Sequence, residues 1–262
     1  MTIQDFQEKK SLGKRISMIT CYDYSFARLI NESQIDAILV GDSAAMVMHG
    51  ADSTLIATME MMEAHTRAVA KGAPNKLVIA DMPFLSYRMG LTLAVENAGR
   101  LMRAGAQAVK LEGADGNIEI IQHLLESGIP VMGHLGLTPQ SIHQLGGFKV
   151  QAKTESAKQK LIADSQRLQQ AGCFSLVLEC VPSSLANKIA SNLEIPVIGI
   201  GAGPGVDGQV LVLQDLLGMN PGFRPKFLRT FLDGHRVLTD AFNNYHAAVI
   251  SNAFPSPQES YE

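Results

Sequence analysis

The chain has 262 residues, of which 46% are hydrophobic, and its formal net charge is −3 with a pI near 6.2. A chain of this length can bury a full hydrophobic core, and the absence of a Lys/Arg block argues against a surface for nucleic acid or for an anionic membrane. No apolar stretch approaches the ~18 residues of a membrane span, and the polar start Met1–Lys10 lacks the pattern of a signal peptide. We therefore expect no membrane and no nucleic-acid partner.

Eight short apolar runs alternate with helical patterns along the chain, at an average period of 262/8, about 33 residues, close to the ~30 of a βαβ unit. Runs rich in Val, Ile and Leu predict buried parallel strands. The predicted strands are Ile16–Tyr22, Ala37–Asp42, Lys76–Asp81, Ala108–Glu112, Pro130–Leu135, Phe174–Val181, Pro196–Gly201 and Gln209–Gln214. The even spacing favours a (β/α)8 TIM barrel, for which ~250 residues is typical, over an open doubly wound sheet.

The predicted helices lie between these strands. Thr92 is placed to N-cap a helix over Leu93–Ala104, and Gly105 would end that helix in the left-handed conformation. Gly128 and Gly172 precede later strands in the same way.

Two further helices follow toward the C-terminus. A helix over Thr154–Ala171 would carry Leu161, Ser165 and Leu168 on one face, as expected of a helix in the outer ring. A last helix, about Pro225–Ser251, would either close the barrel or contact another subunit through the apolar stripe of Leu238, Phe242, Tyr245 and Val249. Without any linker or shift in composition, we expect a single domain over residues 1–262 with a frayed tail from about residue 252.

Three successive predicted strands carry an acid at the carboxyl end: Asp42, Asp81 and Glu112, 39 and 31 residues apart. The carboxyl ends of barrel strands form the mouth where active sites lie. Carboxylates that converge there repel one another by about 4 kcal/mol per pair at ~4 Å. Oxygen ligands without a Cys/His cluster favour a hard cation such as Mg²⁺. The alternative for Asp42 alone is a helix N-cap.

Lys110 lies two residues before Glu112, so both side chains would point into the barrel. There they form either part of the site or an internal salt bridge. A Mg²⁺ with open positions can chelate a 2-oxo acid and act as a Lewis acid. Glu179, at the end of the sixth strand, could serve as a general base across the mouth, or simply favour a helix N-terminus before Pro182.

Two loops add candidate binding groups. The glycine run Gly199–Gly205 does not fit G-x-G-x-x-G, but loops after strands seven and eight often bind an anion. His134 ends the fifth strand and precedes the long connection Gly136–Lys153, which has the length of a lid or binding loop. We place His134 among the substrate contacts, although a lone histidine is more often structural.

These residues occur within a series of motifs that resembles the ketopantoate hydroxymethyltransferase (3-methyl-2-oxobutanoate hydroxymethyltransferase) family along almost the whole chain. The motifs are Thr20–Ala27, Leu39–Ser43, Lys71–Asn75, Ala80–Phe84, Met102–Ala106, Val109–Gly113, Gly133–Ser141, Gly146–Gln151, Leu176–Pro182, Ile195–Gly203 and Asp207–Gln209. So many separate motifs in one order are highly specific. The loop Gly203–Gly208 and the C-terminal tail match less well.

The resemblance implies a (β/α)8 barrel, commonly a homodecamer, that transfers a hydroxymethyl group from 5,10-methylenetetrahydrofolate to 3-methyl-2-oxobutanoate in pantothenate biosynthesis. It implies that Asp42, Asp81 and Glu112 hold Mg²⁺, and that Glu179 accepts the proton. It also implies that the 2-oxo acid is contacted by Asp42, Ser43, Asp81 and Lys110.

Two alternatives remain open. A Mg²⁺-dependent enzyme of the phosphoenolpyruvate mutase/isocitrate lyase type shares the barrel and the acidic mouth, but its Lys-Lys-Cys-Gly-His-like loop is absent from this sequence. A non-catalytic binding module would have little need for Lys110 and four acids. Three cysteines without CxxC spacing (Cys21, Cys173 and Cys180) favour a reduced, cytoplasmic protein without disulfides.

Overall fold

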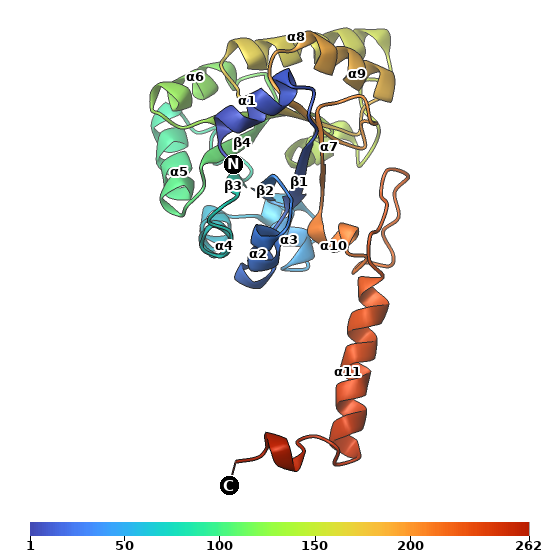
Figure 1. Cartoon of the computed structure of the whole chain (residues 1–262). Helices are drawn as coiled ribbons and strands as arrows, with labels where there is room; N and C mark the ends of the chain where they lie inside the picture. The colour runs from blue at the N-terminus through green and yellow to red at the C-terminus, as the bar shows by residue number, and fades with distance from the viewer. Residues whose placement is uncertain (262) are drawn as a thin grey trace. The chain divides into compact units, whose positions relative to one another are not determined.

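The computed structural model describes residues 1–261, which form two compact units, one from Met1 to Leu211 and one from Val212 onward. In the described part of the first unit, eight parallel strands close into a barrel in chain order, and β8 pairs back to β1. Helices surround the strands (Figure 1). The predicted (β/α)8 barrel is confirmed, and the open sheet is wrong.

Each strand coincides with a predicted apolar run, with ends shifted by up to three residues. The strands are β1 (Ile16–Thr20), β2 (Ala37–Val40), β3 (Leu77–Asp81), β4 (Ala108–Glu112), β5 (Val131–Gly136), β6 (Ser175–Glu179), β7 (Val197–Ile200) and β8 (Gly208–Leu211). Most of their residues are buried, because helices cover the outside of a parallel barrel and side chains fill its inside.

The helices of the first unit connect these strands. They are α1 (Ile3–Ser11), α2 (Tyr24–Glu32), α3 (Ala44–Val47), α4 (Met59–Gly72), α5 (Leu91–Arg103), α6 (Ile118–Glu126), α7 (Ile142–Leu145), α8 (Glu155–Gln170) and α9 (Ser183–Asn192), with 3-10 turns at η1 (Thr54–Ile56) and η2 (Pro139–Ser141). None of the helices in residues 1–261 is long and apolar enough to cross a lipid bilayer.

The predicted ends of these helices are mostly confirmed. Helix α8 starts after Thr154, whose hydroxyl accepts a hydrogen bond from the Ala157 N–H, and it buries Leu161, Ser165 and Leu168. Gly105, Gly128 and Gly172 have φ values of 113°, 80° and 101° at the ends of α5, α6 and α8.

The predicted cap at Thr92 is wrong. Helix α5 begins at Leu91, and its cap position is Gly90, with a φ of 99°. Glycine adopts this backbone conformation without steric strain, so the chain enters the helix before Thr92 is reached.

Helix α1 closes the amino-terminal end of the barrel. Phe6 is fully buried in the core cluster with Ile16, Met18 and Ile79, and its ring packs edge-on against Phe174 with centroids 6.0 Å apart. Because this end is filled, the carboxyl ends of the strands are the open mouth of the barrel.

The second unit contains α10 (Leu213–Leu216), α11 (Gly234–Ile250) and the turn η3 (Pro257–Glu259). Helix α11 starts later than the predicted Pro225, because the Phe231 N–H donates to Leu216 O and the Gly234 N–H donates to Leu217 O. These backbone groups therefore bind the end of α10 and the turn after it, not helical partners. The single domain and the frayed tail stay predictions, and Glu262 at the tip of that tail lies outside the described residues.

Candidate active site

The acids predicted at the strand ends come together at the mouth of the barrel. Asp81 ends β3 and Glu112 ends β4, while Asp42 follows β2 by two residues. In the parallel register, Asp81 lies beside Lys110, and Glu112 lies beside His134. All five side chains are buried, each in a residue with no more than 4% of its surface exposed.

Lys110 is the counter-cation of this cluster. Its Nζ lies 2.9 Å from Asp81 Oδ1 and 3.8 Å from Glu112 Oε1, and 3.2 Å from His134 Nδ1. Burial alone would lower the pKa of Lys110, but the negative charges of Asp81 and Glu112 outweigh it and raise that pKa. The lysine therefore remains charged among the carboxylates.

Ionisation of Asp42 is disfavoured in this cluster. Its backbone N–H donates to Asp81 Oδ2 at 3.1 Å, which sets the two acids side by side. Burial, together with the charges of Asp81 and Glu112, raises the pKa of Asp42 well above its usual value. The alternative role as a helix cap does not apply, because Ser43 occupies the cap position of α3.

The donor chemistry of this cluster fits a hard divalent cation. Asp81 Oδ1 and Glu112 Oε1 are buried without a hydrogen bond of good geometry, although Lys110 lies near both. Within residues 1–261, however, no three His, Cys, Asp or Glu side chains stand as a ready-made metal centre. The fit thus rests on the type of donor, carboxylate oxygens, because Mg²⁺ binds through one or two carboxylates while it keeps several waters.

His134 joins the cluster to Glu179. His134 Nδ1 lies 3.3 Å from Glu112 Oε1, and Nε2 lies 3.3 Å from Glu179 Oε2. Burial and the Lys110 charge would lower the pKa of His134, but its contacts with Glu112 and Glu179 raise it to about 9. Glu179 is the most exposed of these acids, with 18% of its side chain accessible, and Pro182 rather than Glu179 caps α9.

Ser43 lies next to Asp42, and its hydroxyl is 2.8 Å from the hydroxyl of the buried Tyr22. In the glycine run after β7, Gly201 and Gly203 adopt φ values of 63° and 79° and shape a turn. The anion-binding role of this turn stays a prediction.

Two buried residues of the site were not singled out from the sequence. Gln140, in η2, donates from its side-chain amide to Asp42 Oδ2 and from its backbone N–H to Glu112 Oε2, at 2.9 and 3.0 Å. Tyr87 donates from its hydroxyl to Gln140 Oε1 at 2.9 Å. Gln140 lies in the long connection after β5 and within the motif Gly133–Ser141, but neither feature distinguished it from its neighbours.

That connection is tied down at both ends beside the predicted base. The Leu137 N–H donates to Glu179 O, and the Gln151 N–H donates to Cys180 O, both at 2.8 Å. The segment between them carries Gln140 over the mouth of the barrel.

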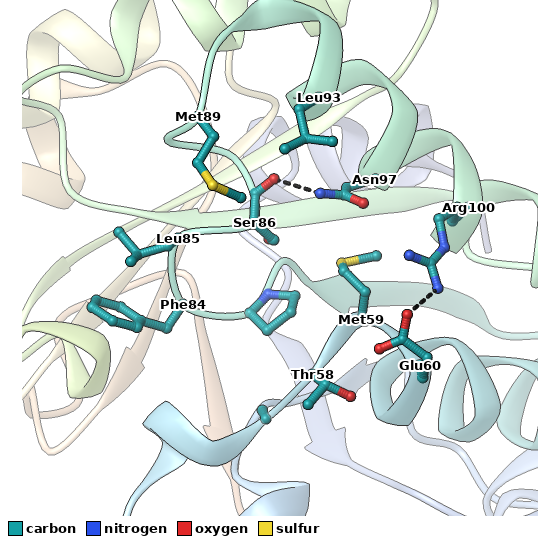
Figure 2. A pocket seen from close by; sticks show the side chains of 12 residues that line it. Thr58, Met59, Glu60, Phe84, Leu85, Ser86, Met89, Leu93, Asn97 and Arg100 are labelled. Atoms are coloured by element: carbon teal, nitrogen blue, oxygen red, sulfur yellow. Dashed lines mark hydrogen bonds and ion pairs between the residues drawn. The ribbon is translucent and has the colours of Figure 1, made fainter.

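A pocket of about 330 Å³ lies beside this site but does not include it. Figure 2 shows that it lies between the loop after β3 and helices α4 and α5, with Met59, Phe84, Leu85 and Met89 among its lining side chains. Its polar contacts are internal, because Arg100 pairs with Glu60 and the Asn97 amide donates to Ser86 O. None of the predicted site residues lines it.

Buried carboxylates that surround a lysine and a histidine at the open end of a parallel barrel define a (β/α)8 enzyme site for a small ligand. Solved structures with this fold include a phosphonopyruvate hydrolase in complex with oxalate and Mg²⁺, with a TM-score of 0.64 and 13% identity, covering 99% of this chain and 93% of that one. A 2,3-dimethylmalate lyase of the PEP mutase/isocitrate lyase superfamily has a TM-score of 0.59 and 16% identity, covering 98% and 92%. At these identities the likeness shows the fold alone.

Sequence comparison identifies the family. Residues 1–257 match the family described as ketopantoate hydroxymethyltransferase. The 3-methyl-2-oxobutanoate hydroxymethyltransferase of Bdellovibrio bacteriovorus is 60% identical over 99% of both chains. The enzymes of the same name from Coxiella burnetii and Francisella tularensis subsp. novicida are 56% and 48% identical, covering 97% and 100% of this chain and 96% and 98% of theirs. The chain belongs to the ketopantoate hydroxymethyltransferase family.

Proposed function

We propose that the chain transfers a hydroxymethyl group from 5,10-methylenetetrahydrofolate to 3-methyl-2-oxobutanoate, giving ketopantoate for pantothenate and coenzyme A biosynthesis. The observation that carries this proposal is the buried cluster of Asp42, Asp81, Glu112 and Lys110 at the barrel mouth of a member of this family. The similarity to mutases and lyases is limited to the fold, so it does not favour the alternative activity.

Asp42, Asp81 and Glu112 would hold Mg²⁺. When bound, the ion would polarise the keto group of the substrate and so make the proton on C3 more acidic. Burial and the repulsion from neighbouring acids raise the pKa of Asp42, and a cation would offset both effects, which supports this assignment.

Glu179 would accept the C3 proton on its carboxylate. Its Oε2 lies 3.3 Å from His134 Nε2, so the histidine would hold the base in place and keep its charge compensated. The ammonium of Lys110 would stabilise the substrate carboxylate or the oxyanion that develops as the proton leaves. Ser43 and His134 would complete the contacts to the 2-oxo acid.

The deprotonated C3 would then form a carbon–carbon bond with the methylene carbon of the folate. The two bonds from that carbon to N5 and N10 of the folate break, and water supplies the hydroxyl group. Tetrahydrofolate leaves with the C3 proton and the remaining proton of the water on those two nitrogens. This order of steps separates proton removal from carbon transfer, which makes the base testable without folate.

The test is the exchange of the C3 proton of 3-methyl-2-oxobutanoate in D₂O with Mg²⁺, followed by NMR. We expect Glu179→Gln to slow the exchange by at least about 100-fold, in the range of general-base contributions. Glu194→Gln, a change at an exposed acid outside the site, is the control and should exchange at the wild-type rate. Unimpaired exchange in Glu179→Gln would contradict the assignment of the base.

We also propose that the chain forms a homodecamer in the cytoplasm. Exposed apolar side chains on α11, such as Phe242 and Tyr245, support assembly, because a face of this kind is ordinarily covered. The three free cysteines support a reducing compartment.

A further inference from the structure

Gln140, in the loop after β5, contacts Asp42 through its side chain. It is 6% exposed, and both hydrogens of its amide are used: Nε2 donates to Asp42 Oδ2 and to Met82 O, each at 2.9 Å. Its Oε1 accepts from the Tyr87 hydroxyl. These partners fix the orientation of the amide, because the opposite orientation would place an oxygen against a carboxylate and a carbonyl.

The backbone of the same residue reaches a second acid. The Gln140 N–H donates to Glu112 Oε2 at 3.0 Å, while Glu112 Oε1 receives no hydrogen bond of good geometry. One residue thus engages one oxygen of Asp42 and one oxygen of Glu112, and leaves the other oxygen of each acid to face another partner. A neutral donor does this without adding charge to a crowded cluster.

We infer that Gln140 is a positioning residue for the metal site: it holds Asp42 and Glu112 at a fixed separation, so the affinity for a divalent cation depends on its amide. This inference rests on the magnesium site proposed above. Outer partners that orient metal ligands typically change metal affinity by about 10- to 100-fold when removed. Gln140 would act through the carboxylates and would not itself contact the metal.

The variant Gln140→Leu isolates the side-chain contribution. Leucine has a similar volume and keeps the backbone N–H that binds Glu112, but it removes the donor to Asp42. Gln151→Leu is the matched control, because Gln151 lies in the same loop and its amide donates only to Lys149 O. The probe is Mn²⁺, whose free concentration is measured by electron paramagnetic resonance during titration of the purified chain.

We expect Gln140→Leu to weaken Mn²⁺ binding by about 10- to 100-fold and Gln151→Leu to leave it unchanged. In activity assays, the Mg²⁺ concentration for half-maximal rate should rise by a similar factor, while the rate at saturating Mg²⁺ returns to within about threefold of wild type. A purely structural role would lower the rate at every Mg²⁺ concentration. If Gln140→Leu does not fold, Gln140→Asn takes its place, since its shorter amide falls about one methylene short of Asp42.

Two further arms keep this inference separate from the proposed function. If the wild-type chain binds no Mn²⁺, or if Asp81→Asn binds it as well as wild type, the metal site itself is wrong and the inference falls with it. Suppose that wild type binds Mn²⁺ and Asp81→Asn does not. A decrease in Mn²⁺ affinity of less than fivefold in the Gln140 variant then overturns the role of Gln140 but not the metal site. A decrease in Mn²⁺ affinity of fivefold or more in the Gln140 variant, with no such decrease in Gln151→Leu, supports the role of Gln140.

Discussion

At the scale of single residues, the site combines excess negative charge with burial. Asp42, Asp81 and Glu112 share the cation Lys110, and burial with the neighbouring acids raises the pKa of Asp42 well above its ordinary 3.8. Uncompensated buried charge destabilises a folded chain. The residues that would bind a metal therefore weaken the protein whenever the metal is absent.

We expect Asp42→Asn to stabilise the metal-free protein at neutral pH. A carboxyl whose pKa is raised on folding binds more protons in the native state than in the unfolded state. The free energy of unfolding of metal-free wild type therefore falls as the pH rises from 3.8 through the pKa of Asp42 in the folded chain. Asparagine cannot titrate, so the advantage of the variant should grow with pH. Urea unfolding in EDTA across pH 5–8 measures this.

Addition of Mg²⁺ provides the control for that comparison. Ligand that binds only the native state stabilises it, so Mg²⁺ should raise the free energy of unfolding of wild type and leave Asp42→Asn unchanged. If metal-free Asp42→Asn were less stable than metal-free wild type throughout this pH range, the charge of Asp42 would not be what destabilises the protein.

At the scale of elements, the ends of β5 and β6 are packed so closely that a side chain would not fit. Gly136 has a φ of 93°, and a Cβ on it would clash with the carbonyl oxygen of Glu179. The same oxygen accepts the hydrogen bond from Leu137. The position of the proposed base therefore depends on a glycine in the neighbouring strand.

We expect Gly136→Ala to lower kcat by about 10- to 100-fold, because a shift of ~1 Å in a catalytic group can cause a loss of that size. Gly128→Ala is the control: Gly128 has a φ of 80°, but a Cβ there meets nothing within 4 Å. Both variants should lose about 1–2 kcal/mol of stability from backbone strain. Gly136→Ala should lose more than Gly128→Ala, because its Cβ would also clash with the backbone of Glu179. Steady-state rates and thermal unfolding distinguish the two variants. Equal kcat values would show that the position of the base does not depend on Gly136.

The sequence predicted the elements that follow from periodicity. Repeating apolar runs predicted all eight strands, and the acids predicted at three strand ends are buried residues of the barrel. Thr92 failed as a cap because the conformation of Gly90 decided where α5 begins.

Gln140 could not be found in this way. It lies 98 residues from Asp42, and no local pattern links the two. Its role depends on how a loop folds back over the barrel. The start of α11 was missed for a similar reason, because backbone bonds to residues around α10 replaced helical ones.

At the scale of the whole molecule, one end of the barrel is closed by its own N-terminal helix. Phe6 is fully buried in the core cluster. Lys10 Nζ, also in α1, pairs with Asp207 at 2.8 Å. The stability of the barrel and the chemistry at its mouth are thus located at opposite ends of the strands.

We expect Phe6→Ala to destabilise the protein by about 3–5 kcal/mol, the usual effect of removing a buried aromatic ring, with little change in Mn²⁺ affinity. Leu29→Ala removes an apolar side chain that is 63% exposed, so its effect should stay within about 0.5 kcal/mol. Denaturant unfolding and metal titration make the comparison. A loss of metal affinity in folded Phe6→Ala would show that the two ends are coupled.

Helix α11 makes the proposed assembly testable. Phe242 and Tyr245 are 69% and 62% exposed on one stripe, so a charge at position 242 should break contacts with another subunit. We expect Phe242→Glu to lower the mass measured by sedimentation equilibrium below that of wild type. Asn244→Glu, on a different side of the same helix, should keep the wild-type mass; if both variants do so, this stripe is not an interface.

The two anchors of the loop after β5 limit how the protein can change in evolution. Leu137 and Gln151 attach the loop to the backbone of Glu179 and Cys180, and Gln140 lies close to the first anchor. Insertions between Ile142 and Val150 would lengthen the loop without moving either attachment, whereas a single deletion between Leu137 and Gln140 would pull the amide away from Asp42. Relatives should therefore differ in loop length only in the middle of this segment, and libraries aimed at new substrates can vary that part most freely.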